Sequence, residues 1–169
     1  IKLEGGVRIA PQINALVEAG IVVMGHIGLT PQSSGQLGGH KAQGRTAETA
    51  RLVVEDARAV QEAGAQMILL EAIPPEVGRY ITEDLDIPVL SIGAGPHCDG
   101  QLLIVSDAIG QFQAFTPKFV KKYCNVAAMV TDAMKAYAAE VRGGDFPGDE
   151  HCYKMIEGEE EKFLELIES

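Results

Sequence analysis

The sequence predicts an α/β fold in which a parallel sheet lies inside and helices lie outside it. Short runs of apolar residues, many of them β-branched, alternate with longer segments whose apolar residues recur at helical spacing. The short runs are apolar throughout, which is typical of strands buried on both faces of a parallel sheet. The chain has 169 residues, of which 46% are hydrophobic and 22% charged, and this composition argues against intrinsic disorder.

Apart from the opening residues 1–4, each predicted strand is a short, mostly apolar run bounded by glycine or polar residues. The first is the Ile-Lys-Leu-Glu sequence that opens the chain without an initiator Met, so we expect the chain to start inside an element. A further apolar run, residues 102–105, fits either a strand or a short helix. The predicted strands are residues 1–4, 21–25, 67–70 and 87–92.

The predicted helices have recognisable start and stop signals. Thr46 is a candidate N-cap, and Pro75 stands in a first helical turn, where its missing N–H costs nothing. Gly20 and Gly64 each follow a Glu-Ala pair, and each is expected to end a helix just before a strand. The predicted helices are residues 9–19, 46–63, 75–83 and 126–142. Residues 28–45 form a long polar loop, and loops of that length are often functional lids.

Composition narrows the partners and the compartment. A net charge of −10 argues against a nucleic-acid partner. The three cysteines are widely spaced and form no C-x-x-C motif, which argues against disulfides and structural zinc and fits the cytoplasm. No apolar run approaches the ~18 residues that a membrane span needs, and no signal peptide is visible. We therefore expect a cytoplasmic protein that binds neither nucleic acid nor membrane.

The acidic end of the chain differs from the rest. Residues 157–169 hold six acids and one lysine, so they carry half of the net charge. Phe163, Leu164 and Ile167 recur at helical spacing there, which predicts either a short amphipathic helix against a neighbouring subunit or a solvated end. We expect residues 1–150 to form the main fold and residues 151–169 to form an acidic tail or helix.

Polar residues at the carboxyl ends of the predicted strands are the candidate site, because parallel α/β folds bind ligands there. Lys2 and Glu4 are two residues apart on a strand and share a face. His26 follows the second strand with Gly25 before it and Gly28 two residues beyond, and Glu71 follows the third. Ser106 and Asp107, with the Gly93-Ala94-Gly95 turn, would end later strands.

Each of these residues also has an ordinary structural explanation. A lone Glu71 can be satisfied by backbone N–H groups or by an arginine, and a lone His26 is more often a buried core residue. Together, however, two carboxylates, a histidine and a lysine suit chemistry next to a carbonyl. A base removes the neighbouring proton, a cation or metal stabilises the enolate, and the enolate attacks an electrophile that spacing does not identify.

Seven spaced segments resemble the ketopantoate hydroxymethyltransferase family. The most specific is Gly-His-Ile-Gly-Leu-Thr-Pro-Gln at residues 25–32. The segments occur in the order of the family and cover nearly the whole chain except the acidic tail. They are residues 1–6, 25–32, 38–45, 70–74, 92–95 with 99–101, 117–121, and 146–147 with 150–151.

The resemblance implies a (βα)8 TIM barrel, of which this chain holds roughly the C-terminal five βα units. It implies hydroxymethyl transfer from 5,10-methylenetetrahydrofolate to 3-methyl-2-oxobutanoate, which gives 2-dehydropantoate on the route to pantothenate and coenzyme A. The family uses Mg2+ to chelate the keto acid during enolisation and aldol-type addition. Its members form large cyclic homo-oligomers, commonly decamers.

The resemblance also implies residue roles. Lys2 would hold the keto acid, His26 would contact it, and Glu71 would be the catalytic base. Glu4 would support the metal through its water shell, since the two Asp residues that ligate the metal directly are expected upstream of this chain. The chain departs from the family at His40, where an aromatic residue is usual, and at Ser106, where histidine is usual.

Two other hypotheses remain open from the sequence. The chain could be a non-catalytic fragment or assembly piece of such a barrel, because the first strands and the direct metal ligands are missing from it. It could also belong to another keto-acid lyase barrel, such as the phosphoenolpyruvate mutase–isocitrate lyase group, which shares the enolate chemistry. A requirement for folate would separate the last hypothesis from the first.

Overall fold

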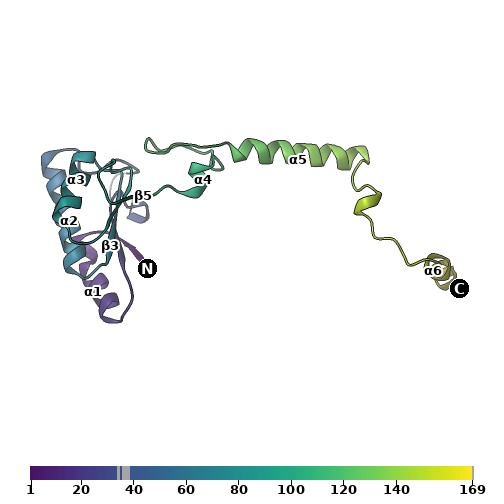
Figure 1. The fold of residues 1–169 in the computed structure, drawn as a ribbon, viewed down its shortest axis with the longest axis horizontal. Coiled ribbons are helices and arrows are strands. Elements are labelled where there is room, and N and C mark those ends of the chain that lie inside the picture. Colours follow the sequence, from purple (N-terminus) through teal and green to yellow (C-terminus); the bar gives the residue numbers. More distant parts are fainter. Residues whose placement is uncertain (34, 36–38, 169) are drawn as a thin grey trace. The chain divides into compact units, whose positions relative to one another are not determined.

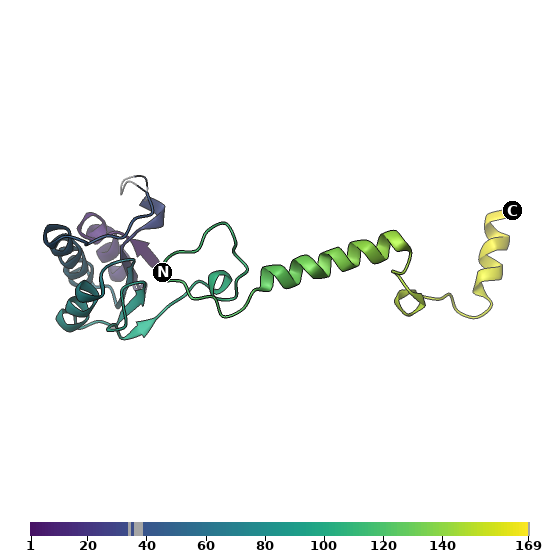
Figure 2. The same ribbon diagram turned by 90° about the horizontal axis from the view of Figure 1, so that it is seen from above.

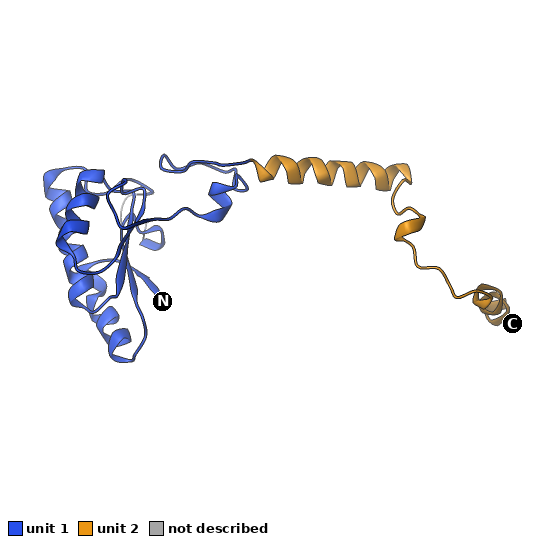
Figure 3. Cartoon of the chain, viewed as in Figure 1, with its two compact units in different colours: residues 1–124 blue, residues 125–169 orange. Residues whose placement is uncertain are grey.

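The computed structural model describes residues 1–33, 35 and 39–168. These residues form two compact units, residues 1–124 and residues 125–169 (Figure 3). Gly38, which begins the third family-like segment, and Ser169, the last residue of the acidic tail, lie outside the described residues. The expected boundary between residues 150 and 151 stays a prediction.

The first unit contains one five-stranded sheet in which every pair of neighbouring strands is parallel. The order of the strands in the sheet is their order in the chain, and this confirms the predicted parallel α/β class. The strands are β1 (Lys2–Glu4), β2 (Met24–Gly28), β3 (Met67–Glu71), β4 (Val89–Ile92) and β5 (Gly100–Gln101).

Helices cover one side of this sheet (Figures 1 and 2). The predicted cap of the second helix is confirmed, because Thr46 Oγ1 accepts the Thr49 N–H at 3.3 Å and Thr49 Oγ1 accepts the Thr46 N–H at 3.0 Å. Gly64 follows that helix with a φ of +93°, as a helix-ending glycine should. The helices are α1 (Ala10–Glu18), α2 (Ala47–Glu62) and α3 (Pro75–Asp84).

The predicted strand at residues 21–25 is wrong in its position. Ile21 and Val22 are 41% and 63% exposed, and β2 begins only at Met24. The neighbouring strands set this start, because Met24 pairs with Lys2 on one side and with Met67 on the other. As a result, His26 lies inside the strand rather than after it.

The prediction for residues 102–105 is also wrong. The fifth strand is the Gly-Gln pair before this run, and only residue 105 enters the short helix α4 (Val105–Ala108). Ser106 and Asp107 therefore lie in a helix and not at the end of a strand. The two-residue strand β5 pairs with Leu90 and Ser91 of β4, which places the start of this segment beside the sheet.

The core lies between the sheet and its helices. It contains fully buried aliphatic side chains from both layers, including Ile13 of α1, Val60 of α2, Ile68 of β3 and Ile81 of α3. Gly25 of β2 lies directly against Val60, so a Cβ added to Gly25 would overlap Val60 Cγ1. The absence of a side chain at residue 25 therefore allows α2 to pack closely on the sheet.

The second unit consists of helices joined by irregular segments. The predicted helix at residues 126–142 is confirmed as α5 (Val126–Gly143), which Asn125 caps and Gly144 ends in the left-handed conformation. The short turn Asp149–His151 and helix α6 (Glu159–Glu168) follow. Residues 159–168 of the tail are thus helical, while the choice between packing on a neighbouring subunit and a solvated end stays a prediction. Among the described residues, no helix combines the length and the apolarity needed to cross a membrane.

We predict that Gly25→Ala destabilises the protein by about 1–3 kcal/mol, because the added methyl group overpacks the contact with α2. Urea unfolding would measure this change. In the double variant with Val60→Ala, the same substitution should cost much less, because the overlapping atom is gone. Gly35→Ala is the control, since a Cβ there meets no atom of the described residues within 4 Å. Equal effects of Gly25→Ala with and without Val60 would contradict the packing argument.

Candidate functional site

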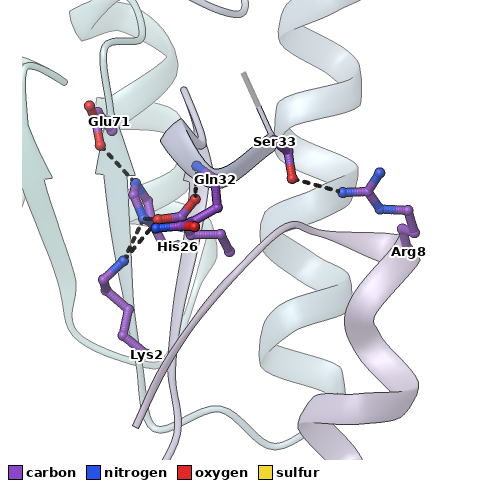
Figure 4. A network of polar contacts seen from close by, with 7 residues as sticks. Lys2, Arg8, His26, Gln32, Ser33 and Glu71 are labelled. Carbon is purple, nitrogen blue, oxygen red and sulfur yellow. Dashed lines mark hydrogen bonds and ion pairs between the residues drawn. The ribbon is translucent and has the colours of Figure 1, made fainter. Parts of the chain in front are cut away.

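Four polar side chains predicted from the sequence meet on one face of β1, β2 and β3 (Figure 4). Glu4 and Glu71 end their strands, whereas Lys2 begins β1 and His26 lies inside β2. The register of the sheet brings them together, because Glu4 pairs with His26 and Gly28 pairs with Glu71. Side chains alternate between the two faces along each strand, so Lys2, Glu4, His26 and Glu71 share one face. The opposite face holds Gly25 and packs on α2. The site therefore lies on the face without these helices.

His26 is the centre of this group. Its residue is only 2% exposed, and its ring is contacted at both nitrogens. Nδ1 lies 2.9 Å from Lys2 Nζ, and Nε2 lies 3.0 Å from Glu71 Oε2. A lysine ammonium only donates hydrogen bonds, so Nδ1 must accept, and Nε2 then carries the ring proton. The lysine thus selects the tautomer whose proton is on Nε2, the nitrogen nearer to Glu71.

The His26 Nε2–H has no hydrogen-bond partner among the described residues. Although Glu71 Oε2 is close, it does not lie in the direction of a hydrogen bond, and Nε2 is buried without a hydrogen-bond partner among the described residues. A buried donor left in this state costs roughly 1–3 kcal/mol. A substrate oxygen placed beside Nε2 would recover this energy. We therefore interpret Nε2–H as a donor available to a ligand.

Glu4 connects the strand ends to the long polar loop. Its Oε1 accepts a hydrogen bond from Lys2 Nζ at 3.3 Å and lies 3.4 Å from His26 Nδ1. Its Oε2 accepts the backbone N–H of Gln32 at 2.9 Å. The next residue, Ser33, accepts a hydrogen bond from Arg8 at 3.4 Å (Figure 4). The start of the loop predicted as a lid is therefore held against β1.

A side chain of helix α2 fixes the turn that follows β1. Asp56 of α2 accepts the N–H of Val7 at 2.8 Å, and a Cβ added to Gly6 would overlap the Asp56 carboxyl group. Burial raises the pKa of Asp56, and the hydrogen bond from Val7 opposes that shift. The glycine at residue 6 thus permits a contact that fixes the end of the strand carrying Lys2 and Glu4.

The residues of this site do not fit a directly bound magnesium ion. Across residues 1–33, 35 and 39–168, no group of three or more His, Cys, Asp or Glu side chains could hold a metal. Magnesium prefers several oxygen ligands, whereas both oxygens of Glu4 already accept hydrogen bonds and Lys2 lies beside them. The expected contact of Glu4 with a metal through water stays a prediction.

A cavity of about 510 Å³ adjoins the catalytic candidate Glu71. Leu29 and Ile92 form part of its wall, and Ser106 and Asp107 line it from α4. Three phenylalanines that the sequence reasoning missed also line it, namely Phe112, Phe115 and Phe119. They lie in a segment without helical or strand periodicity. Their clustering in the sequence could have indicated an aromatic site, because three of the chain's five phenylalanines lie within residues 112–119.

The glycine turn after β4 supports one wall of this cavity. Gly93 has a φ of +81°, and a Cβ there would overlap the ring of Phe119. The Ala94 N–H donates to the side chain of Ser91 at 3.0 Å, so this amide is not directed at a ligand. The turn is therefore a structural feature that makes room for an aromatic ring.

Comparisons with known proteins agree with the sequence motifs. The family model described as ketopantoate hydroxymethyltransferase matches residues 1–149. Curated relatives named 3-methyl-2-oxobutanoate hydroxymethyltransferase include those of Alkaliphilus metalliredigens, 62% identical over 95% of this chain, and Syntrophobacter fumaroxidans, 52% identical over 98% of it. A third, from Syntrophomonas wolfei, is 50% identical over 93% of the chain. The matched regions are 57%, 59% and 57% of these relatives, so the chain spans less than two thirds of their length.

We predict that the His26 ring carries its proton on Nε2, because Lys2 Nζ lies in hydrogen-bonding distance of Nδ1. Long-range ¹H–¹⁵N NMR of the imidazole distinguishes the two neutral tautomers and the charged ring. The Lys2→Met variant should mix the tautomers, because Nδ1 loses its donor. Lys162→Met is the matched control, since Lys162 pairs with Glu159 in α6. A ring protonated on Nδ1 in the parent protein would contradict the assigned geometry.

Proposed function

The chain belongs to the ketopantoate hydroxymethyltransferase family, and on that premise we propose that the protein transfers a hydroxymethyl group from 5,10-methylenetetrahydrofolate to 3-methyl-2-oxobutanoate. The product would be 2-dehydropantoate, an intermediate of pantothenate and coenzyme A biosynthesis. One observation carries the proposal. The buried His26 Nε2–H lies without a hydrogen-bond partner among the described residues, close to Glu71 and on the same face as Lys2.

The first proposed step is removal of the proton on C3 of the keto acid. Glu71 is the base, and its side chain is 13% exposed beside the cavity. The His26 Nε2–H donates to the C2 oxygen as negative charge develops there, and the Lys2 ammonium attracts the substrate carboxylate. General bases typically contribute about 10²–10⁴-fold to a rate, and a donor to an oxyanion about 10²–10³-fold.

The second step forms the new carbon–carbon bond. The enolate carbon attacks the one-carbon unit at the oxidation level of formaldehyde, and both carbon–nitrogen bonds of the donor break. One water molecule supplies the oxygen of the hydroxymethyl group, and its two hydrogens end on the donor nitrogens of tetrahydrofolate. The proton that Glu71 removed passes to the new hydroxyl oxygen. No group is oxidised or reduced overall.

No step is assigned to Mg2+, because the described residues do not fit a directly bound ion. Magnesium dependence remains part of the family-based proposal. In that proposal Glu4 acts through water on the metal, and the direct ligands are Asp residues expected upstream of Lys2. Glu4 suits this indirect role, since its two oxygens already accept hydrogen bonds from Lys2 and Gln32.

We also propose that the five strands are part of a (βα)8 barrel. Sequential parallel strands with helices on one face are the arrangement of such a barrel, in which site residues project from the strand ends. The family-based expectations of a cyclic homo-oligomer, commonly a decamer, and of a cytoplasmic location stay predictions.

Glu71→Gln tests the role of the base. In the whole protein, exchange of the C3 proton of 3-methyl-2-oxobutanoate with D2O should fall by about 10²–10⁴-fold, because glutamine cannot accept the proton. NMR of the keto acid measures this exchange without folate. Glu83→Gln, at an exposed position of α3, should exchange at the parent rate.

Two results would overturn parts of this proposal. Exchange by Glu71→Gln within twofold of the parent rate would remove Glu71 as the base. Product formation by the parent protein without methylenetetrahydrofolate would favour another keto-acid barrel enzyme. A parent protein that catalyses neither exchange nor product formation would favour a non-catalytic assembly piece.

A further inference from the structure

The cavity beside Glu71 is larger than the keto acid requires. Its volume of about 510 Å³ lies in the range of about 300–1,000 Å³ that holds a drug-sized ligand. A five-carbon keto acid bound between Lys2, His26 and Glu71 would leave most of this space unfilled. The cavity is therefore large enough for a second and bulkier reactant.

The wall of the cavity is suited to a flat ring. The rings of Phe112 and Phe115 meet edge to face, with centroids 5.8 Å apart and planes at 85°. They remain 39% and 57% exposed, so much of their apolar surface is in contact with water. Phe119 also lines the cavity, and its ring lies where a side chain at residue 93 would otherwise be. A heteroaromatic ring in the cavity would bury these surfaces and stack against them.

Two charged residues on the rim differ in sign. Asp107 is half-buried in α4, and Lys118 is exposed. Neither side chain has an ion pair or hydrogen bond to another residue within the described parts of the chain. A carboxylate pairs well with two adjacent N–H groups of a flat heterocycle, and a lysine attracts an anionic tail.

Resting on the proposed function, we propose that this cavity binds the one-carbon donor through its reduced pterin. The phenylalanine rings stack against the pterin, and Asp107 accepts hydrogen bonds from its ring N–H and exocyclic amino group. Lys118 faces the anionic glutamate portion of the donor. Because Glu71 lines the same cavity, the one-carbon unit would lie next to the carbon that Glu71 deprotonates.

Two substitutions in the whole protein test this assignment. Phe115→Leu and Asp107→Asn should each raise the Kd for tetrahydrofolate, measured by calorimetry, by about tenfold or more, because stacking or a charge-assisted pair is lost. The KM for methylenetetrahydrofolate should rise in parallel, while the KM for the keto acid stays within about twofold. Phe115→Trp should retain tetrahydrofolate binding, because a larger ring preserves the stacking, and its fluorescence should change on binding.

Tyr80→Leu is the matched control, because Tyr80 is also a half-exposed aromatic residue, at 50%, but lies on α3 and does not line this cavity. Its Kd for tetrahydrofolate should match that of the parent. Thermal unfolding of every variant separates loss of a contact from loss of the fold.

The result separates this inference from the proposed function. If the parent exchanges the C3 proton of the keto acid but tetrahydrofolate binding is unchanged in both Phe115→Leu and Asp107→Asn, the cavity assignment is wrong and the enolisation proposal stands. If the parent does not exchange that proton, the proposed function fails whatever tetrahydrofolate does. Loss of binding in both variants, with an unaffected Tyr80→Leu, supports the assignment.

Discussion

The hydrogen bond between Lys2 and His26 is the interaction on which the rest of the site depends. It places a donor against Nδ1 at 2.9 Å, so the ring proton must lie on Nε2. That nitrogen lies 3.0 Å from Glu71 Oε2, and Glu71 also lines the cavity. Both ring nitrogens also lie near a carboxylate, Glu4 at Nδ1 and Glu71 at Nε2, so the donor from Lys2 decides between the two tautomers. The orientation of a single buried ring thus connects substrate binding to the base.

The parallel sheet produces this geometry because alternate residues of each strand point to opposite faces of the sheet. Residues with small or aliphatic side chains point toward the helices, and Gly25 allows α2 to approach closely. The alternate positions on the same strands carry the polar side chains of the site. A shift of one residue in the register of β2 would exchange the two sets and bury His26 under α2. Packing on one face therefore fixes the chemistry on the other.

The sequence predicted the parallel sheet, most helices and the four polar residues of the site, because each is encoded by local pattern or by strand order. It misplaced the start of β2. That strand begins where Met24 pairs with Lys2 and Met67, and the apolar run at Ile21 does not decide it. It missed the phenylalanine lining, because Phe112 and Phe115 lie in an irregular segment, and other residues lining the cavity, such as Glu71, come from distant parts of the chain. The unpartnered Nε2–H also required the structure, since it depends on the direction of Glu71 as well as on its distance.

The most direct test follows the His26 Nε2 proton when the keto acid binds. In a ¹⁵N-labelled whole protein, titration with 3-methyl-2-oxobutanoate should move the Nε2–H resonance downfield and slow its exchange with water, because a substrate oxygen becomes its acceptor. The Nδ1 resonance should stay that of an acceptor for Lys2. A keto acid that binds, as shown by shifts elsewhere, without altering the Nε2–H resonance would contradict the role given to His26.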